Sequence, residues 1–262
     1  MNKELFYSTI RKALFGGKLS QSQVEGIEGL LKAFDQVGDR DLDTLAYGLA
    51  TAYHETGSRM VPVREGFAST DAGARKAVAN LAKKRGPNSA VAKYAKPAGP
   101  FGHVYYGRGH VQLTWLENYL NSSKDAGVDL VRWPDEMLDP VISARVLFRG
   151  IMDGRWNGKG KGLDFYEGED EVLSDAEAAE ARRTVNVKDK ALLIAGYHRK
   201  FYDALNRAGW EEARSPEPPQ EVVGNTPLAS PVGNPPSPTP NAVPLGLFQA
   251  ILKWLSSLKK GS

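Results

Sequence analysis

The chain has 262 residues, of which 41% are hydrophobic and 25% are charged, and its formal net charge is +3. This composition is typical of a globular protein, and no stretch approaches the ~18 consecutive apolar residues that span a membrane. The absence of cysteine excludes disulfides, thiolate catalysis and cysteine-ligated zinc. The first residues lack the apolar core of a secretory signal, so we expect the protein to stay in the cytoplasm until another agent releases it.

The positive charge is concentrated in residues 242–262. This segment contains Lys253, Lys259 and Lys260 and no acidic residue, which accounts for the whole net charge. Residues 1–241 therefore lack the basic excess that favours binding to nucleic acid. We expect a monomer with no nucleic-acid partner.

The first 55 residues predict helices. Apolar side chains recur at helical spacing over residues 3–36, with a polar start signal at 20–23. The next helix begins at 41–44 and continues to about Glu55. Its apolar stripe consists of Leu45, Leu49 and Ala52. A second face of the same helix carries Tyr47, Thr51 and Glu55.

The middle of the chain predicts loops and then further helices. Residues 57–104 show no steady period beyond a short helix near 71–84, and we expect long, partly mobile loops over a cleft. Asp139-Pro140 is a strong helix start, and two more helices are predicted over 175–184 and 189–208. The residues predicted to face the core are Val141, Ala144, Leu147, Phe148 and Ile151, and later Leu192, Ala195, Phe201 and Leu205. The fold class is mainly α, with at most a small hairpin.

The C-terminal fifth of the chain differs in composition from the rest. Ten of the sixteen prolines fall in residues 214–244, which predicts an extended linker between a body at 1–213 and a tail at 245–262. The tail has the pattern of a cationic amphipathic helix. It either docks on the body or contacts an anionic membrane or lipopolysaccharide surface, and the proline-rich tether favours the second interpretation.

Two glutamates ten residues apart stand on different supports. Glu55 ends an apolar helix, whereas Glu65 follows a turn that contains glycine and proline. Acid/base cleavage of a glycosidic bond needs two carboxyl groups held in this way. The helix dipole and apolar neighbours favour a protonated Glu55, suited to donate a proton, whereas we expect Glu65 to be more solvated and ionised, suited to activate water. The alternative is that both are ordinary surface glutamates.

His54 raises the alternative of a metal site. The zinc-protease spacing requires a second histidine four residues later, but position 58 is serine. The four histidines are not clustered in sequence, so we expect no metal and no other cofactor.

Residues 105–119 combine aromatic and hydrogen-bonding side chains. The hydrogen-bonding groups are Gln112, Thr114 and Asn118, and the aromatic ones are Tyr105, Tyr106, Trp115 and Tyr119. Sugars bind to aromatic faces through their CH surfaces and to amides and hydroxyls through their OH groups. The block therefore predicts the wall of a sugar-binding cleft, with a structural polar network as the alternative.

Together these motifs resemble glycoside hydrolase family 19, and more closely the family-19-like endolysins of phages that infect Gram-negative bacteria. The likeness covers residues 40–208. It rests on HETG at 54–57, Glu65, YYGRGHVQLT at 105–114, Asn118-Tyr119, Asp139-Pro140 and the run ARRTVN at 181–186.

The resemblance implies a lysozyme-like fold with a cleft, and a muramidase that hydrolyses the β-1,4 bonds of peptidoglycan strands by inversion. By position, Glu55 matches the general acid, Glu65 the general base and Thr114 the residue that positions the attacking water. Residues expected to bind substrate are Gln112, Asn118, Tyr106 and Asn186. Such an enzyme relies on a holin for release to the periplasm.

The sequence also departs from the plant chitinases of this family. It lacks their cysteines, differs between Glu65 and Tyr105, and has Asn186-Val187-Lys188 in place of Asn-Gly-Gly. These departures favour peptidoglycan over chitin and make Asn186 the least secure of the assigned residues. A chitinase and a non-catalytic wall-binding module are the alternatives.

Overall fold

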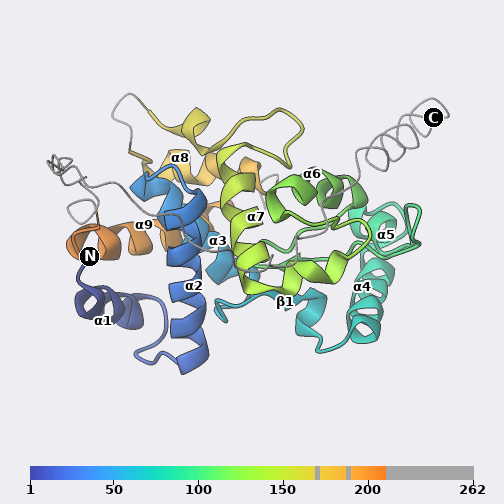
Figure 1. Cartoon of the computed structure of the whole chain (residues 1–262), viewed down its shortest axis with the longest axis horizontal. Coiled ribbons are helices and arrows are strands. Elements are labelled where there is room, and N and C mark those ends of the chain that lie inside the picture. Colours follow the sequence, from blue (N-terminus) through green and yellow to red (C-terminus); the bar gives the residue numbers. More distant parts are fainter. Residues whose placement is uncertain (169–171, 187–189, 211–262) are drawn as a thin grey trace, which may run out of the picture.

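The computed structural model describes residues 1–168, 172–186 and 190–210. The expected linker at 214–244 and the expected tail helix at 245–262 lie outside these residues. The described chain is mainly helical, as predicted, and its only sheet there has two strands (Figure 1). In this part of the chain no helix combines the length and the hydrophobicity needed to cross a bilayer.

Helices account for most of the elements along the chain. The α-helices are α1 Lys3–Ala13, α2 Gln21–Val37, α3 Leu42–Glu55, α4 Asp71–Arg85, α5 Ala90–Tyr94, α6 Leu116–Ala126, α7 Pro140–Met152, α8 Asp175–Glu180 and α9 Ala191–Arg207. Short 3-10 helices are η1 Glu65–Phe67, η2 Pro134–Leu138, η3 Leu163–Tyr166 and η4 Ala181–Thr184. Strands β1 Val63–Arg64 and β2 Arg108–Gly109 pair antiparallel, with Val63 opposite Gly109 and Arg64 opposite Arg108.

Side-chain caps confirm three predicted helix starts. Ser20 begins α2 with a reciprocal capping box that includes Gln23. Asp41 begins α3 by accepting a hydrogen bond from the Thr44 N–H at 2.7 Å. Asp139 begins α7 by accepting from two backbone N–H groups of the first turn.

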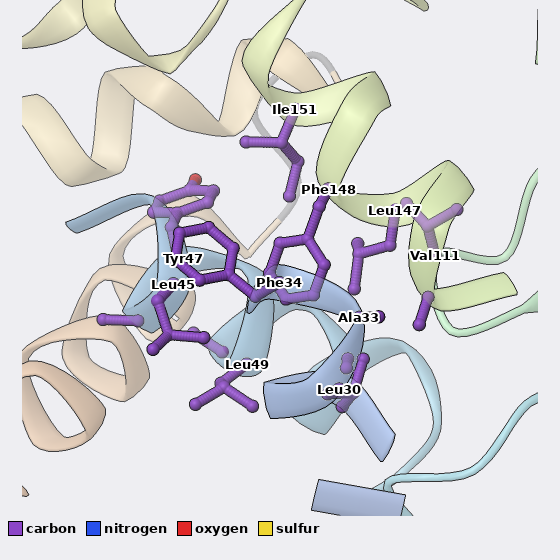
Figure 2. Packing of buried hydrophobic residues seen from close by; sticks show 14 of the residues in the cluster. Leu30, Ala33, Phe34, Leu45, Tyr47, Leu49, Val111, Leu147, Phe148 and Ile151 are labelled. Carbon is purple, nitrogen blue, oxygen red and sulfur yellow. The ribbon is translucent and has the colours of Figure 1, made fainter. Parts of the chain in front are cut away.

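Helix α3 lies at the centre of the large core. Every residue from 42 to 52 is buried, and the helix packs against α2, α7 and α9. Figure 2 shows Phe34 of α2 and Phe148 of α7 in this core, with their ring centroids 5.0 Å apart. Gly48 lets α7 approach closely, because a Cβ at that position would overlap the Phe148 ring. The end of α3 is therefore held by a helix that cannot shift without disturbing the core.

A separate small core lies under α4 and α5, which Figure 1 places on the opposite side of the molecule from α1 and α9. Its buried members are Ala74, Val78, Val91, Val104 and Tyr106. We call residues 65–107 the small lobe and the other described residues the large lobe. Tyr105 and Tyr106 are adjacent in sequence, but Tyr105 packs into the large core and Tyr106 into the small one. The short helix predicted near 71–84 is confirmed as α4, whereas α5 occupies a segment that was predicted as loop, and the two helices share a core of their own.

Two residues predicted to face the core are exposed instead. Val141 is 54% exposed and Leu192 is 80% exposed. Both lie in the first turn of a helix, ahead of the first buried residue, which is Ser143 in α7 and Ile194 in α9. The other predicted core residues of these helices are buried, and they are Ala144, Leu147, Phe148, Ile151, Ala195, Phe201 and Leu205.

Candidate active site

A cleft of about 1520 Å³ is lined by side chains of both lobes. Pockets for small molecules usually measure roughly 300–1,000 Å³, so this cleft has room for several units of a polymer. Six of the residues predicted from sequence line it together, namely Glu55, Glu65, Gln112, Thr114, Asn118 and Asn186. The structure therefore brings side chains from distant segments of the chain into one place.

Glu55 is the last residue of α3, and its side chain is 17% exposed. Its Oε1 atom lies 2.5 Å from Nη2 of Arg182, a side chain that is only 2% exposed. The two residues are 127 positions apart in sequence. A buried guanidinium beside a carboxylate is a strong charge-assisted contact, which fixes the orientation of Glu55 toward the cleft.

The turn after Glu55 is held by its own side chains. The buried Thr56 hydroxyl donates to the Ala52 carbonyl at 2.7 Å and accepts from the Met60 N–H at 3.0 Å. Gly57 has a φ of +57°, and a Cβ at this position would lie 2.8 Å from the Phe67 ring. The turn therefore requires glycine at position 57 for both backbone and packing reasons.

Glu65 follows β1 directly and is tied to Gly107 at two points. Its backbone N–H donates to the Gly107 carbonyl at 2.7 Å, and its Oε2 accepts from the Gly107 N–H at 3.2 Å. A Cβ at position 107 would lie 2.9 Å from Glu65 Oε2 and 2.7 Å from Gln112 Oε1. Glycine at this position therefore allows both side chains to approach the same backbone segment.

The expectation that Glu65 is a well-solvated and readily ionised carboxyl is wrong. Burial raises the pKa of Glu65, the Gly107 N–H opposes that rise, and the negative charge of Glu55 adds to it. Among the described residues no cation pairs with Glu65, in contrast to Glu55. The coupling to Glu55 also indicates that the two carboxyl groups influence each other electrostatically.

Gln112 supports the sheet as well as lining the cleft. Its amide donates to the carbonyl oxygens of Val63 at 3.0 Å and Gly109 at 3.2 Å, which lie opposite each other in the two strands. Thr114 and Asn118 line the same cleft together with Trp115, which is 36% exposed. The Trp115 ring meets the Tyr94 ring edge to face at 5.3 Å. This part of the wall thus combines an aromatic face with polar groups, as sugar binding requires.

Tyr106 does not line the cleft, which corrects its assignment as a substrate-binding residue. It is fully buried, its hydroxyl donates to Asp71 at 2.8 Å, and its ring lies 3.6 Å from the Arg108 guanidinium carbon. Tyr105 and Tyr119 are also buried rather than facing the cleft. These three rings therefore stabilise the lobes from within.

Arg64 and Arg108 bind the same carboxylate, that of Asp135, and we call this set of contacts the clamp. They are partners across the two strands, and both bind Asp135 of η2, at 2.8 and 2.7 Å respectively. Burial opposes ionisation of Asp135, but hydrogen bonds and charge from both arginines outweigh it and lower the pKa of this carboxyl. The clamp fixes the strand from which Glu65 emerges.

Sequence reasoning missed Arg182 and Tyr94 as site residues. Arg182 belongs to the run at 181–186, from which the sequence predicts only Asn186 as a site residue. Tyr94 lines the cleft, and burial raises its pKa to about 12 with a contribution from the charge of Glu65. Its hydroxyl is therefore protonated near neutrality and can act as a hydrogen-bond donor close to Glu65.

His54 does not line the cleft, although it is adjacent to Glu55 in sequence. Its ring is 6.3 Å from the ring of Tyr197 in α9. No group of three metal-ligating side chains occurs in the described residues.

Comparison with protein families matches the chain to a family of glycan-cleaving enzymes. The model of glycoside hydrolase family 19, described as chitinase class I, matches residues 30–168. This range contains the predicted cleft residues from Glu55 to Asn118, whereas Arg182 and Asn186 lie beyond it. No curated protein and no solved structure shows significant similarity to the chain.

Proposed function

The chain belongs to glycoside hydrolase family 19, and from this premise we propose that it is a muramidase that hydrolyses β-1,4 bonds of bacterial peptidoglycan. Family membership supports hydrolysis of a glycan. The proposal adds the identity of the glycan, the catalytic roles of the cleft residues and the biological purpose of the reaction.

One observation carries the proposal: two carboxyl groups from different lobes line a single cleft large enough for a glycan strand. In the proposed reaction, Glu55 donates a proton to the glycosidic oxygen as the bond breaks. Glu65 removes a proton from a water molecule that attacks the opposite face of the sugar, and the Thr114 hydroxyl positions that water. The anomeric configuration inverts because attack and departure occur on opposite faces.

The environment of Glu65 supports its role as the base. A carboxylate with a raised pKa is a stronger base. The Gly107 N–H holds one of its oxygens, so the other can face water. Glu55 must be protonated when it acts. Proton binding to Glu55 must therefore compete with its contact to Arg182 in each catalytic cycle.

The choice of peptidoglycan is supported by the closer likeness of the motifs to phage endolysins. A chitinase is the second candidate, because the matching family model describes chitinases of class I. A wall-binding module without activity is disfavoured by the presence of both carboxyl groups and Thr114 in one cleft.

We further propose that the reaction serves lysis of a Gram-negative host by a phage, with a holin as the route of release. The cationic segment at 245–262 would then help the enzyme reach anionic membrane or lipopolysaccharide surfaces. A chain that ends near Arg214 should retain activity on purified peptidoglycan but bind anionic vesicles less well than the full chain. Equal vesicle binding would contradict a membrane role for the tail.

The substrate is tested by mass spectrometry of products from purified Gram-negative sacculi and from chitin oligomers. A muramidase releases muropeptides with N-acetylmuramic acid at the new reducing end. Products from chitin but not from sacculi would select the chitinase instead. NMR of the first products identifies their anomer, and retained configuration would contradict single displacement.

A further inference from the structure

Three cations line the cleft without a carboxylate partner among the described residues. They are Arg85 at the end of α4 and Lys159 and Lys161 in the loop between α7 and η3. Other arginines near the cleft are compensated: Arg182 pairs with Glu55, and Arg183 pairs with Glu180 at 2.8 Å. The cleft thus presents positive charge that the described part of the fold does not neutralise.

The loop that carries the two lysines is anchored at its start. Trp156 lines the cleft, and its ring N–H donates to the Ser122 hydroxyl of α6 at 3.0 Å. The same ring packs against Gly150, where a Cβ would overlap it. Arg155 binds Asp125 at 3.0 Å, which ties the loop to the end of α6. The base of the loop is therefore fixed to two helices.

The loop is also braced between the lysines. The Asn157 amide donates to the Lys161 carbonyl at 2.8 Å, and its side-chain oxygen accepts from the Lys159 N–H at 2.9 Å. The Lys161 ammonium lies 3.5 Å from the centre of the Phe165 ring, which also lines the cleft. Both lysines thus line the cleft from a braced loop of the large lobe, while Arg85 lines it from the small lobe.

The acidic residues of the cleft do not cancel this charge by direct pairing. Glu55 and Glu180 are each bound to an arginine, and Glu65 is tied to Gly107. Glu117 lies in the first turn of α6 beside Trp115, and no ion pair joins it to either lysine in the described residues. A ligand that fills the cleft can therefore meet uncompensated positive charge on both lobes.

Resting on the proposed muramidase function, we infer that Arg85, Lys159 and Lys161 form a subsite for the carboxylates of peptidoglycan stem peptides. A chitin chain carries no charge, whereas every second sugar of peptidoglycan bears a peptide with carboxylate groups. Cations on the rim of a binding site favour association with anionic partners and distinguish charged ligands from neutral ones. The subsite would select peptidoglycan over chitin without touching the bond that is cut.

The test compares the double variant Lys159→Gln/Lys161→Gln with the wild type on two glycans of matched length. One is soluble peptidoglycan strand with its stem peptides. The other is the same strand after an amidase has removed the peptides and the lactyl carboxylates that this exposes have been converted to neutral methylamides. We expect KM on the peptide-bearing strand to rise about three- to tenfold with little change in kcat, because exposed ion pairs contribute modestly. KM on the peptide-free strand should not change. The variant Arg85→Gln should show the same selectivity to a smaller extent.

Lys83→Gln/Lys84→Gln is the matched control, because these lysines are exposed on α4 but do not line the cleft. Raising the salt from about 0.02 to about 0.3 M should reduce the wild-type preference for the peptide-bearing strand through screening. An equal rise of KM on both strands, or no rise on either, would overturn the subsite while leaving the muramidase function intact. Cleavage of chitin oligomers alone by the wild type would overturn the function, and the subsite with it.

Discussion

The two carboxyl groups of the cleft are supported in opposite ways by the two sides of the molecule. Glu55 ends a helix that is buried in the large core, and a buried arginine compensates its charge. Glu65 follows a strand of two residues and is held through two hydrogen bonds with Gly107. One group is thus fixed by packing and charge, and the other by backbone hydrogen bonds at the edge of the small lobe.

This difference shows that two groups with the same chemistry can contribute to stability with opposite signs. An ionised Glu55 stabilises the fold because it offsets the buried charge of Arg182. An ionised Glu65 costs stability because burial disfavours its charge and the described residues offer it no cation. Substitutions that remove charge without changing shape should separate the two cases.

The substitution Glu55→Gln should have the largest effect. It removes the proposed proton donor, so kcat on peptidoglycan should fall by about 10²–10⁴. It also leaves the Arg182 charge uncompensated, which should lower the free energy of unfolding by about 1–3 kcal/mol at pH 7. Release of reducing ends and chemical denaturation measure the two effects. Lysis close to the wild-type rate would contradict the role of the acid, and unchanged stability would contradict the role of Arg182.

The substitution Glu65→Gln should lower kcat by roughly 10²-fold or more but raise stability. The pKa of Glu65 is raised in the folded protein, so the folded state binds protons more readily than the unfolded state and loses stability as pH rises through the folded value. At pH 7 the variant should therefore melt about 2–4 °C higher than the wild type. Near pH 4, where both states are largely protonated, the two melting temperatures should converge. A lower melting temperature at pH 7 would remove the contrast between the two glutamates.

The substitution Asp135→Asn should have the smallest effect of the three. The pKa of Asp135 is lowered in the folded protein, so its stabilisation is present above the unfolded value and is lost as pH falls through the folded value. The side chain is 48% exposed, so solvent screening limits the loss to about 1 kcal/mol or less at pH 7. Because the clamp fixes the strand before Glu65, kcat should also fall a few-fold.

Asp175→Asn provides the control for the clamp. This residue also pairs with an arginine, Arg199 at 3.1 Å, but it lies at the start of α8 and does not line the cleft. Thermal melts between pH 3 and pH 7 together with kcat would compare the variants. If Asp175→Asn lowers kcat as much as Asp135→Asn, the clamp has no specific part in positioning the base.

The sequence predicted those parts of the fold whose causes are local. Ser20, Asp41 and Asp139 begin helices because their side chains cap N–H groups only a few residues away. Helix α6 was not predicted, because its N-cap is Trp115, which has a φ of +73° and makes no side-chain cap. The sequence allowed a small hairpin but did not locate the two strands, because two residues are too few to show an alternating pattern.

The parts of the site that depend on distant contacts were not accessible from sequence. No local pattern connects Arg182 to Glu55, since the pairing follows from how η4 folds back onto α3. The neighbouring Tyr105 and Tyr106 have the same chemistry, and the sequence gives no sign that both are buried, each in a different core. The burial of Glu65 was missed for a similar reason, because it depends on Gly107 at the other end of the small lobe.

The hydrogen bonds between Glu65 and Gly107 join the first and last residues of the small lobe. The chain of the small lobe therefore starts and finishes at the same hydrogen-bonded pair of residues. Insertions or deletions within the small lobe would change the shape of one wall of the cleft and leave the Glu65–Gly107 hydrogen bonds in place. Changes in this segment could therefore alter which glycans a related enzyme accepts without moving the Glu65 carboxylate.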